Sequence, residues 1–161
     1  MSPEAVVSCV FCRILRGELT PEILAFRDSR TAVFPSLHQQ PRNPGHMLVV
    51  PTGHVPQLYE IGDDLAGPLM TTLSRVAAAV KTVSRADGVS VRQNNEQHGG
   101  QDVFHVHFHV IPRFAHDAFD IGDDRFPFGA IEVPLRERVE QARRLSEALG
   151  QPVAKGSPSA G

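Results

Sequence analysis

Residues 103–112 read VFHVHFHVIP, and this stretch is the most informative in the chain. Side chains alternate between the two faces of a strand, so His105, His107 and His109 would share one face and the apolar residues between them the other. The apolar face could pack on a helix while the imidazoles face a cleft. Their spacing of about 6.5–7 Å suits a row of donors along an extended polar ligand, or two ligands of one metal. The alternative is that the histidines only form the polar face of a half-buried strand and have no role in binding or catalysis.

The segment before this strand, NNEQHGGQD at residues 94–102, indicates a ligand-binding loop. Its Gly99-Gly100 pair allows backbone N–H groups to approach a ligand closely, and consecutive N–H groups in such a turn form an anion-binding concavity. A simple turn is the competing interpretation. The imidazoles beside the loop suit phosphate chemistry, because a neutral ring nitrogen can attack phosphorus and a protonated neighbour can stabilise phosphate oxygens.

The pattern outside this region predicts an α+β fold. Apolar residues recur every three or four positions in two segments, which indicates helices over residues 65–86 and 135–149. Short apolar runs bounded by turn residues indicate strands at 22–27, 30–35, 46–51 and 89–94, with a loop at 36–45. The short turn between the first two runs favours antiparallel pairing.

The chain has 161 residues and a net charge of −2, and 41% of its residues are hydrophobic. This length predicts one domain over residues 1–149, followed by a small, polar tail at 150–161 that we expect to be disordered. A protein that coats nucleic acid carries a positive surplus, so no nucleic-acid partner is expected. The longest apolar run, VAAAV at 76–80, is far shorter than the roughly 20 residues of a membrane span. The N-terminus lacks the features of a secretory signal, so a cytoplasmic protein is expected.

The only two cysteines, Cys9 and Cys12, have the CxxC spacing. Two cysteines exclude a scaffold of many disulfides. In a reducing compartment CxxC is half of a zinc site or a redox pair, and two inert thiols are the third interpretation. A redox CxxC usually follows a strand and opens a helix in a βαβ unit, whereas no strand is predicted before residue 9, which favours zinc over redox chemistry.

With these features on hand, the chain resembles the histidine triad (HIT) family. The run at 105–111 matches the family signature HxHxHxx with apolar x, and the match extends over Gly99-Gly100-Gln101, Pro44-Gly45-His46 and the opening CVFCRI at 9–14. The opening is similar to that of the bacterial zinc-containing branch of HIT-like nucleotide hydrolases. The resemblance implies a HIT-like α+β fold with an antiparallel sheet of about five strands and two helices. It also implies a homodimer and nucleotidyl hydrolase or transferase activity on nucleoside phosphoramidates or related nucleotide conjugates.

By position, His107 resembles the nucleophile that carries the nucleoside monophosphate as a covalent intermediate. His109 resembles the histidine that bonds the phosphate, and His46 the fourth histidine, which orients or assists the nucleophile. Because the transferase branch that acts on sugar phosphates has Gln in place of His109, the resemblance favours hydrolysis. The substrate-binding positions that it implies are Asn94, Gly100, Gln101, Asp102 and His109.

The zinc-containing members imply a second set of roles. Their ligands match Cys9, Cys12, His54 and His105, a closed tetrahedral set that is typical of structural zinc. This assigns His105 to the metal and leaves His107 for chemistry. For His54 the alternative is an ordinary histidine of a surface loop.

Two positions depart from the family pattern. Many members carry an Asp after the second strand that binds the ribose hydroxyls, but FPSLHQQ at 34–40 has no acid, and the stretch is about two residues longer. Ser36 or His38 could take that role. Asp102 stands where Ser or Thr is frequent, and its carboxylate would either repel a phosphate or accept a proton from a neighbouring His.

Two other functions stay open at this point. The missing ribose carboxylate would suit a nucleotide-binding, zinc-stabilised interaction module with little or no catalysis. The histidine row could instead hold a catalytic metal, which requires an open coordination position.

Overall fold

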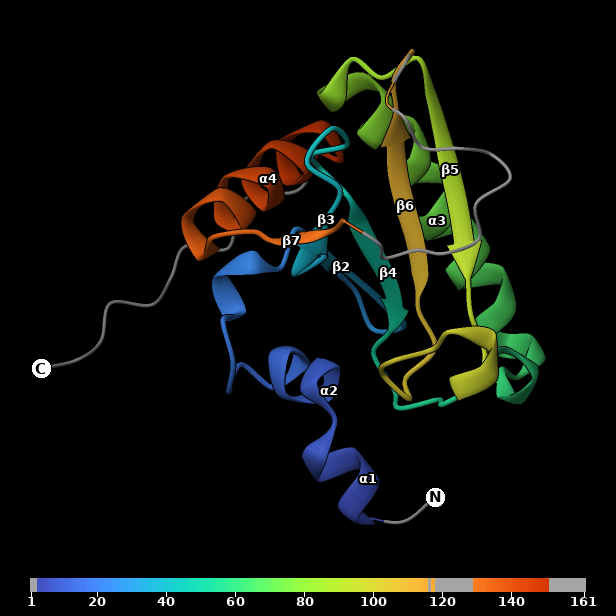
Figure 1. Ribbon diagram of the computed structural model, residues 1–161. Helices are drawn as coiled ribbons and strands as arrows, with labels where there is room; N and C mark the ends of the chain where they lie inside the picture. Colours follow the sequence, from blue (N-terminus) through green and yellow to red (C-terminus); the bar gives the residue numbers. More distant parts are fainter. Residues whose placement is uncertain (1–2, 116, 118–128, 151–161) are drawn as a thin grey trace, which may run out of the picture.

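The structure is a computed structural model that describes residues 3–115, 117 and 129–150. The tail predicted to be disordered lies outside these ranges, apart from its first residue. Five antiparallel strands form the main sheet in the order β1-β2-β4-β6-β5, and two further short strands, β3 and β7, pair with each other (Figure 1). The predicted α+β class and the five-stranded antiparallel sheet are therefore confirmed.

The strands are β1 (Phe26–Arg27), β2 (Thr31–Pro35), β3 (His38–Gln39), β4 (Met47–Pro51), β5 (Gly88–Gln93), β6 (Phe108–Arg113) and β7 (Ile131–Glu132). The α-helices of the described ranges are α1 (Pro3–Ser8), α2 (Val10–Leu15), α3 (Asp63–Ser84) and α4 (Leu135–Ala148). Short 3-10 turns, η1 (Pro21–Ile23), η2 (Leu58–Glu60) and η3 (Gln97–Gly99), join them.

Both faces of the sheet are covered, because alternate residues of β2 and β4 point to opposite sides. On one side, Val33 and Val49 pack in a cluster with apolar residues of α3 and α4. On the other side, Phe34 and Leu48 pack with α2, which contributes Phe11. Every residue of β2 and β4 is consequently buried, and this explains why both read as continuous apolar runs.

The helices α1 and α2 were not expected from the sequence. Each spans six residues, which is too short for an apolar stripe of period 3.6 to repeat. The described chain thus has four α-helices rather than two. The strand expected at 22–27 is reduced to two residues because the 3-10 turn η1 occupies its first half, and the loop expected at 36–45 contains β3. The helices expected at 65–86 and 135–149 are confirmed as α3 and α4.

The strand of the histidine row begins at Phe108 and not at residue 103. The amide of His105 donates to the carbonyl of Val103 at 2.8 Å, which closes a tight turn. The amide of Val106 donates to the carbonyl of Val55 at 2.7 Å, outside the sheet. The expectation that three histidines share one strand face is therefore wrong, because two of them precede the strand.

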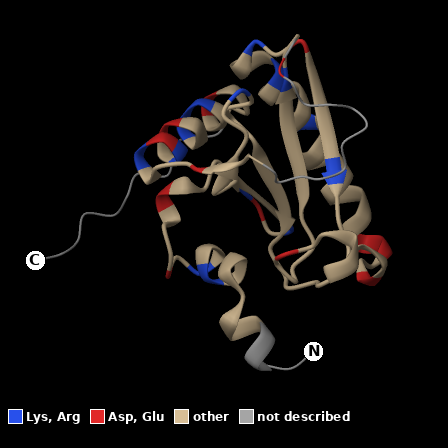
Figure 2. Cartoon of the chain, viewed as in Figure 1, with Lys and Arg blue, Asp and Glu red and all other residues tan. Residues whose placement is uncertain are grey.

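Charged groups of both signs lie side by side on α4 (Figure 2). Arg143 forms ion pairs with Glu140 and Glu147, one turn before and one turn after it. No helix in the described ranges combines the length and the apolar composition needed to cross a bilayer.

Helix α4 is anchored by Leu145, which has no exposed surface in the cluster that joins α4 to α3 and the sheet. Leu145→Ala is expected to lower the free energy of unfolding by about 2–5 kcal/mol, because it removes buried apolar contacts and leaves a cavity. Leu135→Ala on the same helix, at a side chain that is 39% exposed, serves as the matched control and should change it by less than about 0.5 kcal/mol. Urea denaturation of both variants measures the difference, and equal effects would show that α4 is not part of the core.

Candidate functional site

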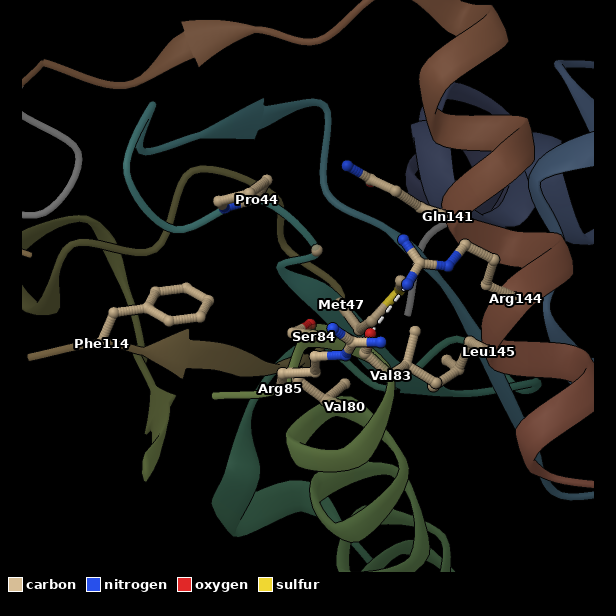
Figure 3. Close-up of a pocket in the computed structure, with 11 residues that line it drawn as sticks. Pro44, Met47, Val80, Val83, Ser84, Arg85, Phe114, Gln141, Arg144 and Leu145 are labelled. Carbon is tan, nitrogen blue, oxygen red and sulfur yellow. Dashed lines mark hydrogen bonds between the residues drawn. The ribbon is translucent and has the colours of Figure 1, made fainter. Parts of the chain in front are cut away.

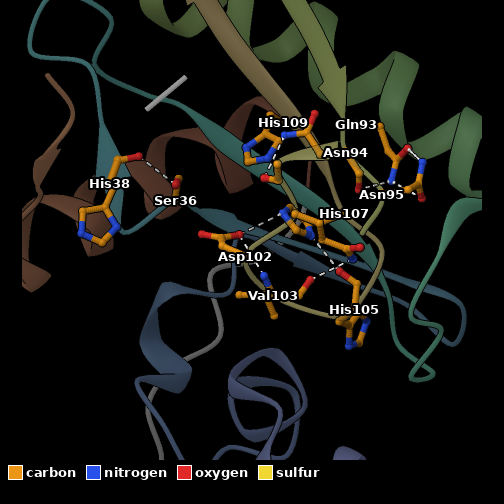
Figure 4. A network of polar contacts seen from close by, with 12 residues as sticks. Ser36, His38, Gln93, Asn94, Asn95, Asp102, Val103, His105, His107 and His109 are labelled. Carbon is orange, nitrogen blue, oxygen red and sulfur yellow. Dashed lines mark hydrogen bonds and ion pairs between the residues drawn. The ribbon is translucent and has the colours of Figure 1, made fainter. Parts of the chain in front are cut away.

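Three of the predicted site histidines meet where the start of β4 pairs with β6. His46 Nε2 lies 3.0 Å from His109 Nδ1, and the rings of His107 and His109 meet edge to face with centroids 4.8 Å apart. His109 of β6 lies directly opposite Leu48 of β4, which brings it close to His46, just before that strand. The structure therefore gathers His46, His107 and His109 into one cluster, as Figure 4 shows for the last two.

His107 is held in one tautomer. Its Nδ1 donates to the backbone carbonyl of His105 at 2.7 Å, so the Nε2 lone pair is left for another partner. The Nε2 atom lies 3.9 Å from Oδ1 of Asp102, whose side chain is 84% exposed, whereas that of His107 is only 2% exposed. Burial lowers the pKa of His107, which keeps the ring neutral and its Nε2 nucleophilic.

The two other histidines of the cluster are also held neutral. Burial, reinforced by the neighbouring His107, lowers the pKa of His109 to about 4. Burial and the proximity of His109 hold the pKa of His46 well below its usual range. The contact between His46 Nε2 and His109 Nδ1 fixes the orientation of the His109 ring beside His107.

The loop between β2 and β4 is fixed by a buried glutamine. Gln39 accepts a hydrogen bond from the amide of Gly45 at 2.9 Å and donates to the carbonyl of Ser36 at 3.0 Å. Its amide also donates to Gln141 of α4 at 2.8 Å and accepts in return at 3.2 Å. The extra length of this loop thus packs against α4, and the peptide just before His46 is held in place.

The glycine loop uses its polar groups internally. The amides of Gly99 and Gly100 donate to the carbonyls of Glu96 and Gln97, so the expected anion-binding concavity is closed by turn hydrogen bonds. Gln101 is buried and bonds three backbone groups of the loops around it. Asn94 donates to the carbonyl of Gly100 at 3.3 Å. The predicted substrate-binding role of these residues remains a prediction, while their role in shaping the loop is evident.

A pocket of about 420 Å³ lies over the histidine cluster. Its floor is a row across three strands, because Phe34 of β2 is opposite Leu48 of β4, which is opposite His109 of β6. His107 and Asp102 also line it. In Figure 4, Ser36, which follows β2, and His38 of β3 lie to one side of these residues. The apolar floor suits a flat ring and the imidazoles suit a phosphate.

A second cluster joins Cys9, Cys12, His54 and His105, whose potential ligand atoms all lie within 4.8 Å of one another. The Nδ1 atom of His105 lies 3.6 Å from both sulfurs, and that of His54 lies 3.3 Å from Cys12 Sγ. With metal–sulfur and metal–nitrogen bonds of about 2.3 and 2.0 Å, the ligand atoms of a tetrahedral zinc are roughly 3.4–3.8 Å apart. The four residues therefore fit a closed metal site.

The protonation pattern of this cluster agrees with that fit. The Nε2 of His105 donates to the carbonyl of Pro51 at 3.0 Å, so its Nδ1 lone pair faces the two sulfurs. Burial lowers the pKa of His105 to about 4, which keeps the ring neutral. Burial and the adjacent Cys9 raise the pKa of Cys12 to about 12, so a thiolate at this position needs a cation beside it.

Two residues at the site were not identified from the sequence. Phe11 of α2 lies edge-on to both His105 and His107, with centroid distances of 5.8 and 5.2 Å, and so joins the two clusters. Arg138 of α4 lines the pocket over His107. The apolar run VFCRIL could have suggested a buried Phe11, but no local signal links residue 138 to a site more than 30 residues earlier in the chain.

A separate hollow of about 390 Å³ opens between the end of α3 and α4 (Figure 3). Its walls include Arg85 and Arg144, and Arg144 donates to the carbonyl of Val83 at 2.8 Å. Gly45 and Met47, the residues on either side of His46, also line it. It therefore lies behind the histidine cluster and does not include the three imidazoles.

Comparison with known proteins agrees with this geometry. The HIT domain model matches residues 18–116, so the chain belongs to the HIT domain family. An uncharacterized HIT-like protein of Saccharolobus solfataricus is 36% identical over 86% of this chain and 90% of its own length. An adenosine 5'-monophosphoramidase of Candida albicans is 33% identical over 66% of this chain and 70% of its own length. The crystal structure of a zinc-bound histidine triad family protein from Mycobacterium smegmatis superposes with a TM-score of 0.70 at 29% identity, covering 90% of this chain and 95% of that one.

The amide pair of Gln39 and Gln141 allows a test of how strongly each residue stabilises the loop before His46. Gln39→Leu is expected to destabilise the fold by about 1–3 kcal/mol, because it leaves buried backbone groups of the loop without partners. Gln141→Leu removes only the partner on α4 and should cost less. Chemical denaturation of both variants measures this order, and a greater loss for Gln141→Leu would contradict it.

Proposed function

We propose that the chain is a HIT-type nucleotidyl hydrolase that acts on nucleoside 5'-phosphoramidates or related nucleotide conjugates through a nucleotidyl intermediate on His107. The observation that carries this proposal is the neutral His107, whose Nδ1–H is used by the carbonyl of His105 and whose Nε2 faces the pocket beside Asp102. The phosphoramidase relative supports the substrate class.

In this mechanism the Nε2 atom of His107 attacks the 5'-phosphorus, and a phosphorus–nitrogen bond to the ring forms as the bond to the leaving amine breaks. The leaving nitrogen takes up a proton from solvent as that bond breaks and departs as the neutral amine. A water molecule then attacks the same phosphorus and gives up a proton to solvent while the phosphorus–Nε2 bond breaks, which releases the nucleoside monophosphate and returns His107 to its neutral starting state. The imidazole of His109 would bond a phosphate oxygen, while His46 holds that ring in position.

We also propose that the metal of the second cluster is zinc and that it is structural. Cys9, Cys12, His54 and His105 supply four ligands, which leaves no position for substrate. The zinc-bound relative supports this metal. Bound there, zinc would supply a cross-link between α2, the loop after β4 and the segment that carries His107, and the imidazoles of the reacting cluster would remain free of metal.

A homodimer is the third part of the proposal. Strand β5 forms one edge of the sheet, and its Val91 side chain is 46% exposed. An edge strand with an exposed apolar residue is a surface that can pair with a second copy. Light scattering of the purified protein tests the oligomeric state.

His107→Asn is expected to reduce AMP release from adenosine 5'-phosphoramidate by about 1000-fold or more, because the attacking atom is removed. The matched control is His98→Asn in the exposed turn η3, which should keep wild-type activity and thermal stability. Mass spectrometry of the quenched wild-type reaction should find an adenylyl group on the peptide with His107. Nucleotide binding without adduct or AMP would instead identify a binding module, and full activity of the variant would exclude His107 as the nucleophile.

Metal analysis should find one zinc per chain, and His54→Ala should lose it while His98→Ala keeps it. The loss should lower the unfolding midpoint by about 5 °C or more, because a ligand set that forms only in the folded chain stabilises that state. Chelated protein that is still folded should continue to turn over substrate. Loss of activity in such folded, chelated protein would favour a catalytic metal.

A further inference from the structure

The pocket over His107 has an unusual charge distribution at its end near Ser36 and His38. Among the described residues that line the pocket, the only carboxylate is Asp102, which lies beside His107. Arg138 is also part of the lining. The part of the pocket where an acid would accept hydrogen bonds from ribose hydroxyls thus contains a cation instead.

Two contacts bring Arg138 to the end of β2. The amide of Val133, just before α4, donates to the carbonyl of Leu37 at 2.9 Å. Gln141, one turn after Arg138, is paired with Gln39. Residues 36–39 therefore lie against the first turns of α4 on both sides of position 138, and Ser36 and His38 line the same pocket as Arg138.

The guanidinium of Arg138 lacks a counterpart within the described chain. Its Nε atom is buried and has no hydrogen-bond partner there, and no ion pair joins Arg138 to a described carboxylate. By contrast, Arg113 is paired with Asp117, and Arg143 is paired with Glu140 and Glu147. Burying an unpaired donor of a charged group costs free energy, so such a group in a pocket indicates a missing acceptor.

The chemistry of the donors defines that acceptor. A guanidinium has only N–H donors and matches the oxygens of a phosphate in a two-point contact. The hydroxyl of Ser36 already donates to the carbonyl of His38. The donors that remain in the lining near it are the guanidinium of Arg138, the imidazole of His38 and the hydroxyl of Thr20, and the guanidinium is the charged one. Glu132 lies opposite His38 in the β3–β7 register but does not line the pocket. An anion is therefore favoured over an unmodified sugar.

We propose that the pocket selects nucleotides that carry a second phosphate on the 2' or 3' oxygen of the ribose, and that Arg138 binds this phosphate. The inference rests on the proposed hydrolase function and specifies its substrate class. The 5'-phosphorus would lie at His107 and His109, the base over the apolar floor of Phe34 and Leu48, and the second phosphate at the end of β2.

The test compares three substrates: adenosine 5'-phosphoramidate and its 2'-phospho and 3'-phospho derivatives. For the wild type, kcat/KM for one of the phosphorylated forms should exceed that for the plain form by about tenfold or more, as a charge-assisted contact predicts. Arg138→Gln should reduce this ratio about tenfold, and Arg138→Lys should retain part of it. Arg136→Gln, the same change at an exposed position of α4 outside the pocket, should keep the wild-type ratio.

The outcomes distinguish a failure of the second-phosphate site from a failure of the hydrolase function. Turnover of the plain substrate with a ratio near one would overturn the second-phosphate site and leave the hydrolase function intact. If none of the three substrates turns over, the hydrolase proposal fails, and calorimetry still tests the site by comparing AMP with adenosine 2',5'- and 3',5'-bisphosphate. Tighter binding of one bisphosphate by wild type but not by Arg138→Gln would support the site, and equal binding of all three would overturn it. Thermal unfolding of each variant confirms that the ratios refer to folded protein.

Discussion

The buried imidazole of His105 is bonded on both of its nitrogens and through its backbone, and the arrangement of both clusters depends on it. Its Nε2–H donates to the carbonyl of Pro51 at the end of β4, which aims Nδ1 at the two cysteine sulfurs. Its own carbonyl accepts the Nδ1–H of His107, which leaves Nε2 of that ring facing Asp102. One residue thereby sets which nitrogen faces the two cysteines and the tautomer of the proposed nucleophile. Moving His105 would disturb the two sites together.

The sites are also coupled through packing. Phe11 lies between His105 and His107 and continues into the cluster with Phe34, whose ring centroid is 5.3 Å away. Cys9 caps the start of the helix that carries Phe11, so the cysteine–histidine cluster also fixes one wall of the pocket. The burial that results excludes water from the imidazoles, and this is the main reason that their pKa values fall.

Much of this arrangement could be predicted from local patterns. The apolar stripe of α3 and the continuous apolar runs of β2 and β4 identified the main helix and the sheet. A helix buried on one face has apolar residues every three or four positions, and a strand buried on both faces is apolar throughout. The grouping of Cys9, Cys12, His54 and His105 followed from the resemblance to zinc-containing relatives, and the geometry agrees with it. The prediction that residues 103–107 belong to the strand was wrong. The alternation of apolar and polar residues cannot reveal that the amide of Val106 bonds to a loop outside the sheet. Arg138 was missed because its place depends on tertiary contacts of residues 133 and 141.

The cysteine–histidine contacts join positions that are 96 and 93 residues apart in the chain. The entropy lost in closing a loop grows only with the logarithm of its length, so this long closure costs little more than a short one. Its kinetic consequence is larger, because a contact of such high sequence separation can form only after most of the intervening chain is in place. During synthesis from the N-terminus, Cys12 can therefore meet His54 before α3 has been made, whereas the contacts of both cysteines with His105 have to wait until α3 and β5 have been made. Assembly of the histidine clusters is thus a late event, and a truncated chain that ends before residue 105 would expose a pair of thiols that the complete protein buries.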